Sequence, residues 1–82
     1  MKASEVLDAR GLICPLPVLK ARKVLLSLPA GTVLTITATD RNSLKDFPLF
    51  CAEQGHDFLG VTEKDGVFTF SVRASGERCA EN

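Results

Sequence analysis

Apolar and polar residues alternate strictly from Thr32 to Thr39, and this is the clearest periodic pattern in the chain. Leu34, Ile36 and Ala38 share one face of this segment, and the opposite face is made largely of threonines. A period of two residues predicts a half-buried β-strand. Because only one face of the strand is apolar, we expect helices to cover one side of the sheet and leave the other side open, in a two-layer architecture.

The segment from Pro15 to Leu28 follows a helical period instead. Its apolar residues recur at spacings of three and four along one stripe, which consists of Val18, Ala21, Val24, Leu25 and Leu28. The polar residues of the opposite side are Lys20, Lys23 and Ser27. This pattern predicts an amphipathic helix whose apolar stripe faces the sheet. The residues Pro29-Ala30-Gly31 then end the helix.

The position of Pro48 determines what is expected after the alternating strand. Ser43 and Asp46 resemble a capping box, but a proline fits poorly inside a helix. We therefore expect a short turn from Ser43 to Asp46 and a separate helix from Pro48 to Gln54. The residues of this region that are expected to pack inward are Phe47, Phe50 and Cys51.

Two further strands are expected on either side of an Asp-Gly turn, Phe58–Glu63 and Val67–Arg73. Phe68, Phe70 and Val72 mark the buried face of the second one. With a short strand from Glu5 to Ala9 at the start, the element order becomes β-α-β-α-β-β. The predicted fold is an α/β two-layer sandwich, in which a four-stranded mixed sheet is covered by two helices on one face.

The length of the chain, 82 residues, allows one small domain without a deep substrate cavity. We assign residues 1–74 to that domain and expect the small, polar residues 75–82 to form a disordered C-terminal tail. A formal net charge of +0 argues against stable nucleic-acid binding. No signal-peptide pattern and no long apolar run occurs, so we expect no membrane insertion and a cytoplasmic location.

Three cysteines, Cys14, Cys51 and Cys79, are an odd number at wide spacing, which is not typical of a disulfide framework. No pair of them has the short spacing of a zinc site, so we expect neither a metal nor a cofactor. Cys51 lies among apolar residues, which favours a buried structural thiol over a resolving cysteine. We expect His56 to be a solvated loop residue and Cys79 to be an incidental thiol in the tail.

Cys14 is the best candidate for chemistry, because it stands directly before a helix that begins with proline. Pro15 suits the first helical position, which makes Cys14 the N-cap residue. Pro15 and Pro17 have no N–H, so we expect the N–H groups of Leu16 and Val18 to face the sulfur. Thiolates at helix N-termini have pKa values lowered to roughly 3.5 to 7.5. The sequence therefore predicts an exposed and partly ionised thiol.

The ten residues from Asp8 to Pro17 resemble the motif of the TusA (SirA-like) sulfur-carrier family, in which D-x-x-G-x-x-C-P-x-P opens the first helix. The resemblance continues through Val18 and Lys23 to the segment Lys45–Cys51, and it covers Glu5 to Ala74. The chain departs from the tRNA-thiolation member at Leu16, where that protein has Glu, and at Asp40-Arg41, where Asp-Pro is common.

The resemblance implies that Cys14 accepts sulfane sulfur as a persulfide and relays it to a downstream protein. It implies a sulfurtransferase that acts as a carrier rather than as a stand-alone turnover enzyme. The implied partners are a cysteine desulfurase or another persulfide donor, and a downstream sulfur-acceptor protein. Family members serve tRNA thiolation, molybdenum-cofactor supply or other sulfur metabolism, and the departures leave the pathway open. The supporting first turn consists of Pro15, Leu16, Pro17 and Val18.

Lys20, Arg22 and Lys23 form a basic patch, which is either a solvated helix face or a docking site for an acidic partner. Asp46 either caps the second helical segment or contacts a partner. One alternative to the carrier is a non-catalytic regulatory or adaptor module that docks through the helix after Cys14. Another is a peroxide-sensing thiol, which is disfavoured because no resolving cysteine lies close in sequence. An exposed, activated thiol favours the carrier.

Overall fold

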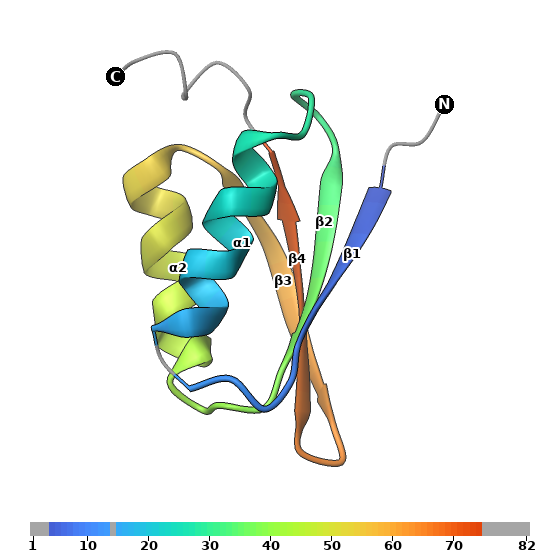
Figure 1. Ribbon diagram of the computed structural model, residues 1–82, viewed down its shortest axis with the longest axis vertical. Coiled ribbons are helices and arrows are strands. Elements are labelled where there is room, and N and C mark those ends of the chain that lie inside the picture. The colour runs from blue at the N-terminus through green and yellow to red at the C-terminus, as the bar shows by residue number, and fades with distance from the viewer. Residues whose placement is uncertain (1–3, 14, 75–82) are drawn as a thin grey trace.

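The computed structural model describes residues 4–13 and 15–74. In chain order the elements are β1 (Ser4–Ala9), α1 (Leu16–Leu26), β2 (Val33–Ala38), α2 (Ser43–Gln54), β3 (Asp57–Lys64) and β4 (Val67–Arg73). The strands form one sheet in the order β1-β2-β4-β3, in which β1 and β2 are parallel and the other neighbours are antiparallel. Both helices lie on the same face of this sheet (Figure 1), so the predicted two-layer α/β fold is confirmed.

The core lies between the helices and the apolar face of the sheet. On β2, Leu34, Ile36 and Ala38 are buried while the threonines between them are half-buried on the open face, as the alternating pattern predicted. The helices contribute the buried side chains of Pro17, Ala21, Leu25, Phe47, Phe50 and Cys51. The rings of Phe47 and Phe70 pack with their centroids 4.6 Å apart. This contact joins α2 to the central strand β4.

The first helix begins one residue later than the sequence predicted, with Pro15 as the N-cap and Leu16 as the first helical residue. Pro15 has φ −99° and ψ 17°, which are close to the values of the third residue in a type I turn. The N–H of Leu16 donates to the carbonyl oxygen of Ile13 at 2.9 Å and closes that turn. The prediction that Cys14 is the N-cap is therefore wrong, because a turn precedes the helix.

The C-terminal end of α1 is at Leu26, two residues before the predicted Leu28. Ser27 ends the helix because its hydroxyl donates to the carbonyl oxygen of Val24 at 2.8 Å. A serine side chain that bonds to the backbone in this way competes with the regular helical hydrogen bonds.

The second helix is continuous through Pro48, so the predicted division into a turn and a separate helix is wrong. Its N-cap is Asn42, without a side-chain cap bond, so Ser43 is not the cap of a capping box either. Pro48 removes the N–H that would donate to the carbonyl of Leu44, which is a single hydrogen bond. Burial of Phe47 and Phe50 on either side of Pro48 offsets that loss, since packing supplies most of a helix's stability in a protein.

The hairpin between β3 and β4 turns at Asp65 and Gly66, whose φ angles of 52° and 80° are both positive. Positive values at both central residues are those of a type I′ turn, the form that Asp-Gly predicts. After β4, Ala74 remains part of the fold, because its N–H donates to the carbonyl of Thr32 at 2.8 Å. The tail predicted for residues 75–82 lies outside the described residues.

Candidate functional site

The candidate site is the connection between β1 and α1, in which Cys14 stands between Ile13 and Pro15. Cys14 itself lies outside the described residues, while the residues on both sides of it are described. The connection leaves the parallel pair of β1 and β2 at one end of the sheet and enters α1 over the core (Figure 1). Leu12 packs against the hydrophobic core, while Ile13 is 69% exposed. The chain therefore comes out to solvent directly before the cysteine.

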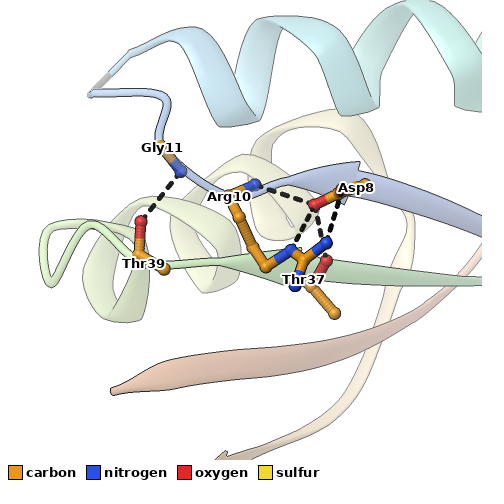
Figure 2. Close-up of polar contacts among 5 residues, drawn as sticks. All are labelled: Asp8, Arg10, Gly11, Thr37 and Thr39. Atoms are coloured by element: carbon orange, nitrogen blue, oxygen red, sulfur yellow. Dashed lines mark hydrogen bonds and ion pairs between the residues drawn. The ribbon is translucent and has the colours of Figure 1, made fainter. Parts of the chain in front are cut away.

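A turn at Gly11 starts this path. The N–H of Leu12 donates to the carbonyl oxygen of Ala9 at 3.3 Å, and Gly11 has a φ of 84°. A positive φ at the third residue is what a type II turn requires, and glycine adopts it without strain. Figure 2 shows that the N–H of Gly11 also donates to the hydroxyl of Thr39, at 2.9 Å. Thr39 directly follows β2, so this bond ties the connection to the central part of the sheet.

An exposed ion pair precedes the turn. The carboxylate of Asp8 accepts hydrogen bonds from Nε of Arg10 at 2.8 Å, from its Nη2 at 3.0 Å and from its backbone N–H at 3.1 Å. The hydroxyl of Thr37 donates to the same carboxylate at 3.2 Å (Figure 2). The side-chain bonds from Arg10 hold the pKa of Asp8 well below its ordinary range and raise the pKa of Arg10. Asp8 therefore remains a charged acceptor at the start of the connection.

The first turn of α1 differs from the predicted arrangement of donors. Of the two N–H groups expected to face the sulfur of Cys14, that of Leu16 donates to Ile13. The carbonyl oxygen of Pro15 accepts from the N–H of Leu19 at 3.1 Å. Of the four residues assigned to this turn, Pro15 and Leu16 are exposed, Val18 is half-buried and Pro17 is buried. Pro17 thus anchors the turn in the core, a packing role that the sequence analysis did not assign to it.

A basic groove borders α1 on one side and is lined by Leu12, Leu16, Leu19, Lys20 and Lys23. Leu16 and Leu19 expose about half of their side-chain surface, 49% and 53%. The lysines were predicted from the sequence, Leu16 was predicted only as part of the first turn, and Leu19 was not predicted, because only the stripe that faces the core was considered. Their position among the lysines, off that stripe, was the signal. Arg22 is also exposed on this helix, as predicted.

An acidic groove lies between α1 and α2 and is lined by Pro15, Val18, Asp46, Leu49, Phe50 and Glu53. It brings Asp46 next to the first turn of α1, although the two segments lie far apart in the sequence. Leu49 is 55% exposed here. The first turn of α1 therefore lies between the basic groove and the acidic groove. Both grooves also contain apolar side chains.

Cys51 lies in α2 and His56 lies between α2 and β3, and both are buried. Cys51 is buried, as predicted, and burial raises the pKa of its thiol to about 11, with a smaller contribution from the charge of Asp57. His56 is only 8% exposed, with its ring 5.7 Å from that of Phe50, so the prediction of a solvated loop residue is wrong. Gly55 turns the chain back at the helix end, where the N–H of His56 reaches the carbonyl of Cys51. Cys79 lies outside the described residues.

Within residues 4–13 and 15–74, no three side chains of His, Cys, Asp or Glu gather so as to hold a metal ion. Neither helix in this part of the chain is long and apolar enough to cross a membrane.

Comparison with known proteins gives consistent matches. A family model described as Sulfurtransferase TusA matches residues 5–74. A protein of Neisseria meningitidis serogroup A is 50% identical over 70 residues, which are 85% of this chain and 95% of the relative. The sulfur carrier protein TusA of Allochromatium vinosum is 44% identical over 69 residues, which are 84% of this chain and 91% of the relative. The crystal structure of a SirA-like protein from Desulfitobacterium hafniense matches with a TM-score of 0.76 and 31% identity, and covers 87% of this chain and 99% of that one.

Proposed function

This chain belongs to the TusA sulfurtransferase family, as its motif predicted, and we propose that it carries sulfane sulfur as a persulfide on Cys14. The observation that supports this most is the family match over residues 5–74, which includes Cys14-Pro15-Leu16-Pro17. The geometry on either side of the cysteine is consistent with it. Ile13 and Pro15, the neighbours of Cys14 in the sequence, are both exposed, which supports a thiol that another protein can reach.

The relay consists of two exchanges at sulfur. The Cys14 thiolate attacks the outer sulfur of a donor persulfide; a new S–S bond forms on Cys14, the S–S bond of the donor breaks, and the donor cysteine leaves as a thiolate. An acceptor thiolate then attacks the outer sulfur on Cys14 and releases the Cys14 thiolate. The sulfur atom moves without net oxidation or reduction, so the step requires an ionised and accessible nucleophile and no cofactor.

The partners dock on the surface around α1. Lys20 and Lys23 on the basic groove, together with Arg22, attract an acidic face of a donor or acceptor, and Leu16 and Leu19 offer it apolar contact. Asp46 belongs to the acidic groove on the other side of the same first turn, where it meets a partner surface of positive charge. Pro15 lines the acidic groove, and Leu12 and Leu16 line the basic groove, so both grooves include residues within two positions of Cys14 in the sequence.

We place the relay in the cytoplasm, where thiols are kept reduced. The donor is a cysteine desulfurase or another persulfide-bearing protein. The acceptor determines whether the sulfur serves tRNA thiolation, molybdenum-cofactor supply or another branch of sulfur metabolism.

Mass spectrometry after incubation with a cysteine desulfurase and cysteine tests this function. We expect a mass gain of one sulfur atom in the wild type and in the Cys51→Ser and Cys79→Ser variants. The Cys14→Ser variant should show no gain. Equal gain in Cys14→Ser would refute the assignment, and no gain in any variant with several donors would favour the adaptor role instead.

A further inference from the structure

Thr39 makes a contact that neither the motif nor the proposed chemistry explains. Its hydroxyl accepts the N–H of Gly11 at 2.9 Å, across 28 residues of sequence (Figure 2). Both residues are exposed. An exposed hydrogen bond contributes little to global stability, because water offers both groups alternative partners. A local structural effect is the better explanation for this bond.

The register of the sheet explains why a side chain is needed at this point. Asp8 lies opposite Thr37, and Ala9 lies opposite Ala38, in the parallel pair of β1 and β2. The next position would place Arg10 opposite Thr39, but the backbone N–H of Arg10 donates to the Asp8 carboxylate instead. The β1–β2 pairing ends at Ala9 and Ala38. One residue after Arg10, the hydroxyl of Thr39 accepts the N–H of Gly11.

The N–H groups of residues 10 to 12 all have acceptors. That of Arg10 donates to Asp8, that of Gly11 to Thr39, and that of Leu12 to Ala9. Two of these acceptors belong to the β1 end itself, within three residues of the donor. Only the Thr39 bond of these three holds the turn to a different strand. A glycine turn has a broad range of backbone angles open to it, so an external anchor decides its direction.

We propose that Thr39 is a positioning residue for Cys14, which follows the anchored Gly11 by three residues. The hydroxyl fixes the direction in which the chain leaves the sheet, and thereby sets the approach of the cysteine to the first turn of α1. The proposal rests on the proposed role of Cys14 as the sulfur acceptor. Asp8, Arg10 and Thr37 hold the preceding residues, and Pro17 holds the helix after the cysteine.

The test replaces the hydroxyl and keeps the shape of the side chain. Thr39→Val removes the acceptor and Thr39→Ser retains it. Thr35→Val is the control, because Thr35 lies within β2, opposite Val6 of β1 and away from the connection. All variants carry Cys51→Ser and Cys79→Ser, so that Cys14 is the single reporter. Two rates are measured over a pH series, alkylation of Cys14 by iodoacetamide and sulfur loading by a cysteine desulfurase.

We expect Thr39→Val to load sulfur about twofold more slowly at neutral pH, because an exposed hydrogen bond has an effect at the low end of the usual range. On this proposal its alkylation profile moves to higher pH, because a displaced thiolate gains less from the positive N-terminal end of α1. Thr39→Ser should restore both properties, and Thr35→Val should change neither. Thermal melting should be similar for the two valine variants. In the wild type, amide exchange measured by NMR should be slower at Gly11 than at exposed loop residues.

An unchanged alkylation profile in Thr39→Val would overturn the proposal, and so would an equal shift in Thr35→Val or a failure of Thr39→Ser to restore the profile. Alkylation reports on the thiol whether or not it carries sulfur. A shifted profile in a protein that takes up no sulfur would therefore support the positioning role and refute the proposed function.

Discussion

The core around α2 and the connection into α1 are held together by different forces. Phe47 and Cys51 are buried almost completely and make apolar contacts. The connection is held instead by exposed polar bonds, from Gly11 to Thr39 and from Arg10 to Asp8. Apolar burial stabilises the whole domain. Exposed polar hydrogen bonds fix the local geometry and add little to global stability. Substitutions in the two regions should therefore separate folding from sulfur transfer.

The difference also explains the two kinds of thiol. Burial raises the pKa of Cys51 to about 11, which makes it a poor nucleophile at neutral pH. Cys14 lies outside the described residues, but its neighbours in sequence, Ile13 and Pro15, are exposed, and a thiolate at this position remains a prediction. With the proposed role of Cys14, one small domain would contain one cysteine for packing and another for chemistry.

The largest effect is expected from Phe47→Ala. Removal of this ring leaves a cavity against Phe70 and should lower the free energy of unfolding by about 3–5 kcal/mol. The matched control is Leu49→Ala on the same helix, which is 55% exposed and should cost less than about 1 kcal/mol. Urea denaturation measures both. Similar losses of unfolding free energy in the two variants would show that burial of Phe47 is not what stabilises α2.

The next effect concerns the reactivity of Cys51. In a Cys14→Ser, Cys79→Ser background, the folded protein should react with iodoacetamide at pH 8 at least about a hundredfold more slowly than the urea-unfolded protein, because both the raised pKa and burial suppress the thiolate. Mass spectrometry of quenched samples follows the reaction. Comparable rates in the two states would contradict the assignment of Cys51 as a structural thiol.

The raised pKa of Cys51 also determines how stability depends on pH. The unfolded thiol ionises near its ordinary value of about 8.5, and the folded one near 11. Between these values the folded state binds more protons, so stability should fall as the pH rises above about 8.5 and level off above about 11. The Cys51→Ala variant should lack this part of the decline. A parallel decline in both proteins would assign it to other groups.

The fold was predictable from periodic patterns in the sequence. The predictions were wrong where one particular contact determines the local structure. The alternating pattern of β2 and the Asp-Gly turn were sufficient to predict these elements, because the local sequence preference and the tertiary packing favour the same structure there. The continuous α2 was missed because burial of Phe47 and Phe50 outweighs one hydrogen bond lost at Pro48. His56 was misplaced because its ring packs on Phe50, a contact that no local pattern shows.

The candidate site was predictable only in part. The motif identified Cys14, and the helical pattern identified Lys20, Arg22 and Lys23, which are exposed; their roles stay predictions. Thr39 was not predicted, because its contact with Gly11 spans 28 residues and depends on where the β1 ladder ends. The acidic groove was missed for the same reason, since it requires α1 and α2 to lie side by side.

The smallest effect is expected from charge reversal on the basic groove. Lys20→Glu with Lys23→Glu should weaken association with an acidic donor or acceptor severalfold at low salt, because exposed charges act mainly on the encounter of two proteins. Association rates at two ionic strengths measure the effect, which should shrink at high salt. The control is Lys45→Glu with Lys64→Glu, which makes the same change of net charge outside this groove. Alkylation of Cys14 should be unaffected in both pairs.

Equal weakening by the control pair would mean that the overall charge of the protein, and not the basic groove, attracts the partner. Unchanged association at low salt would mean that Lys20 and Lys23 form only a solvated helix face.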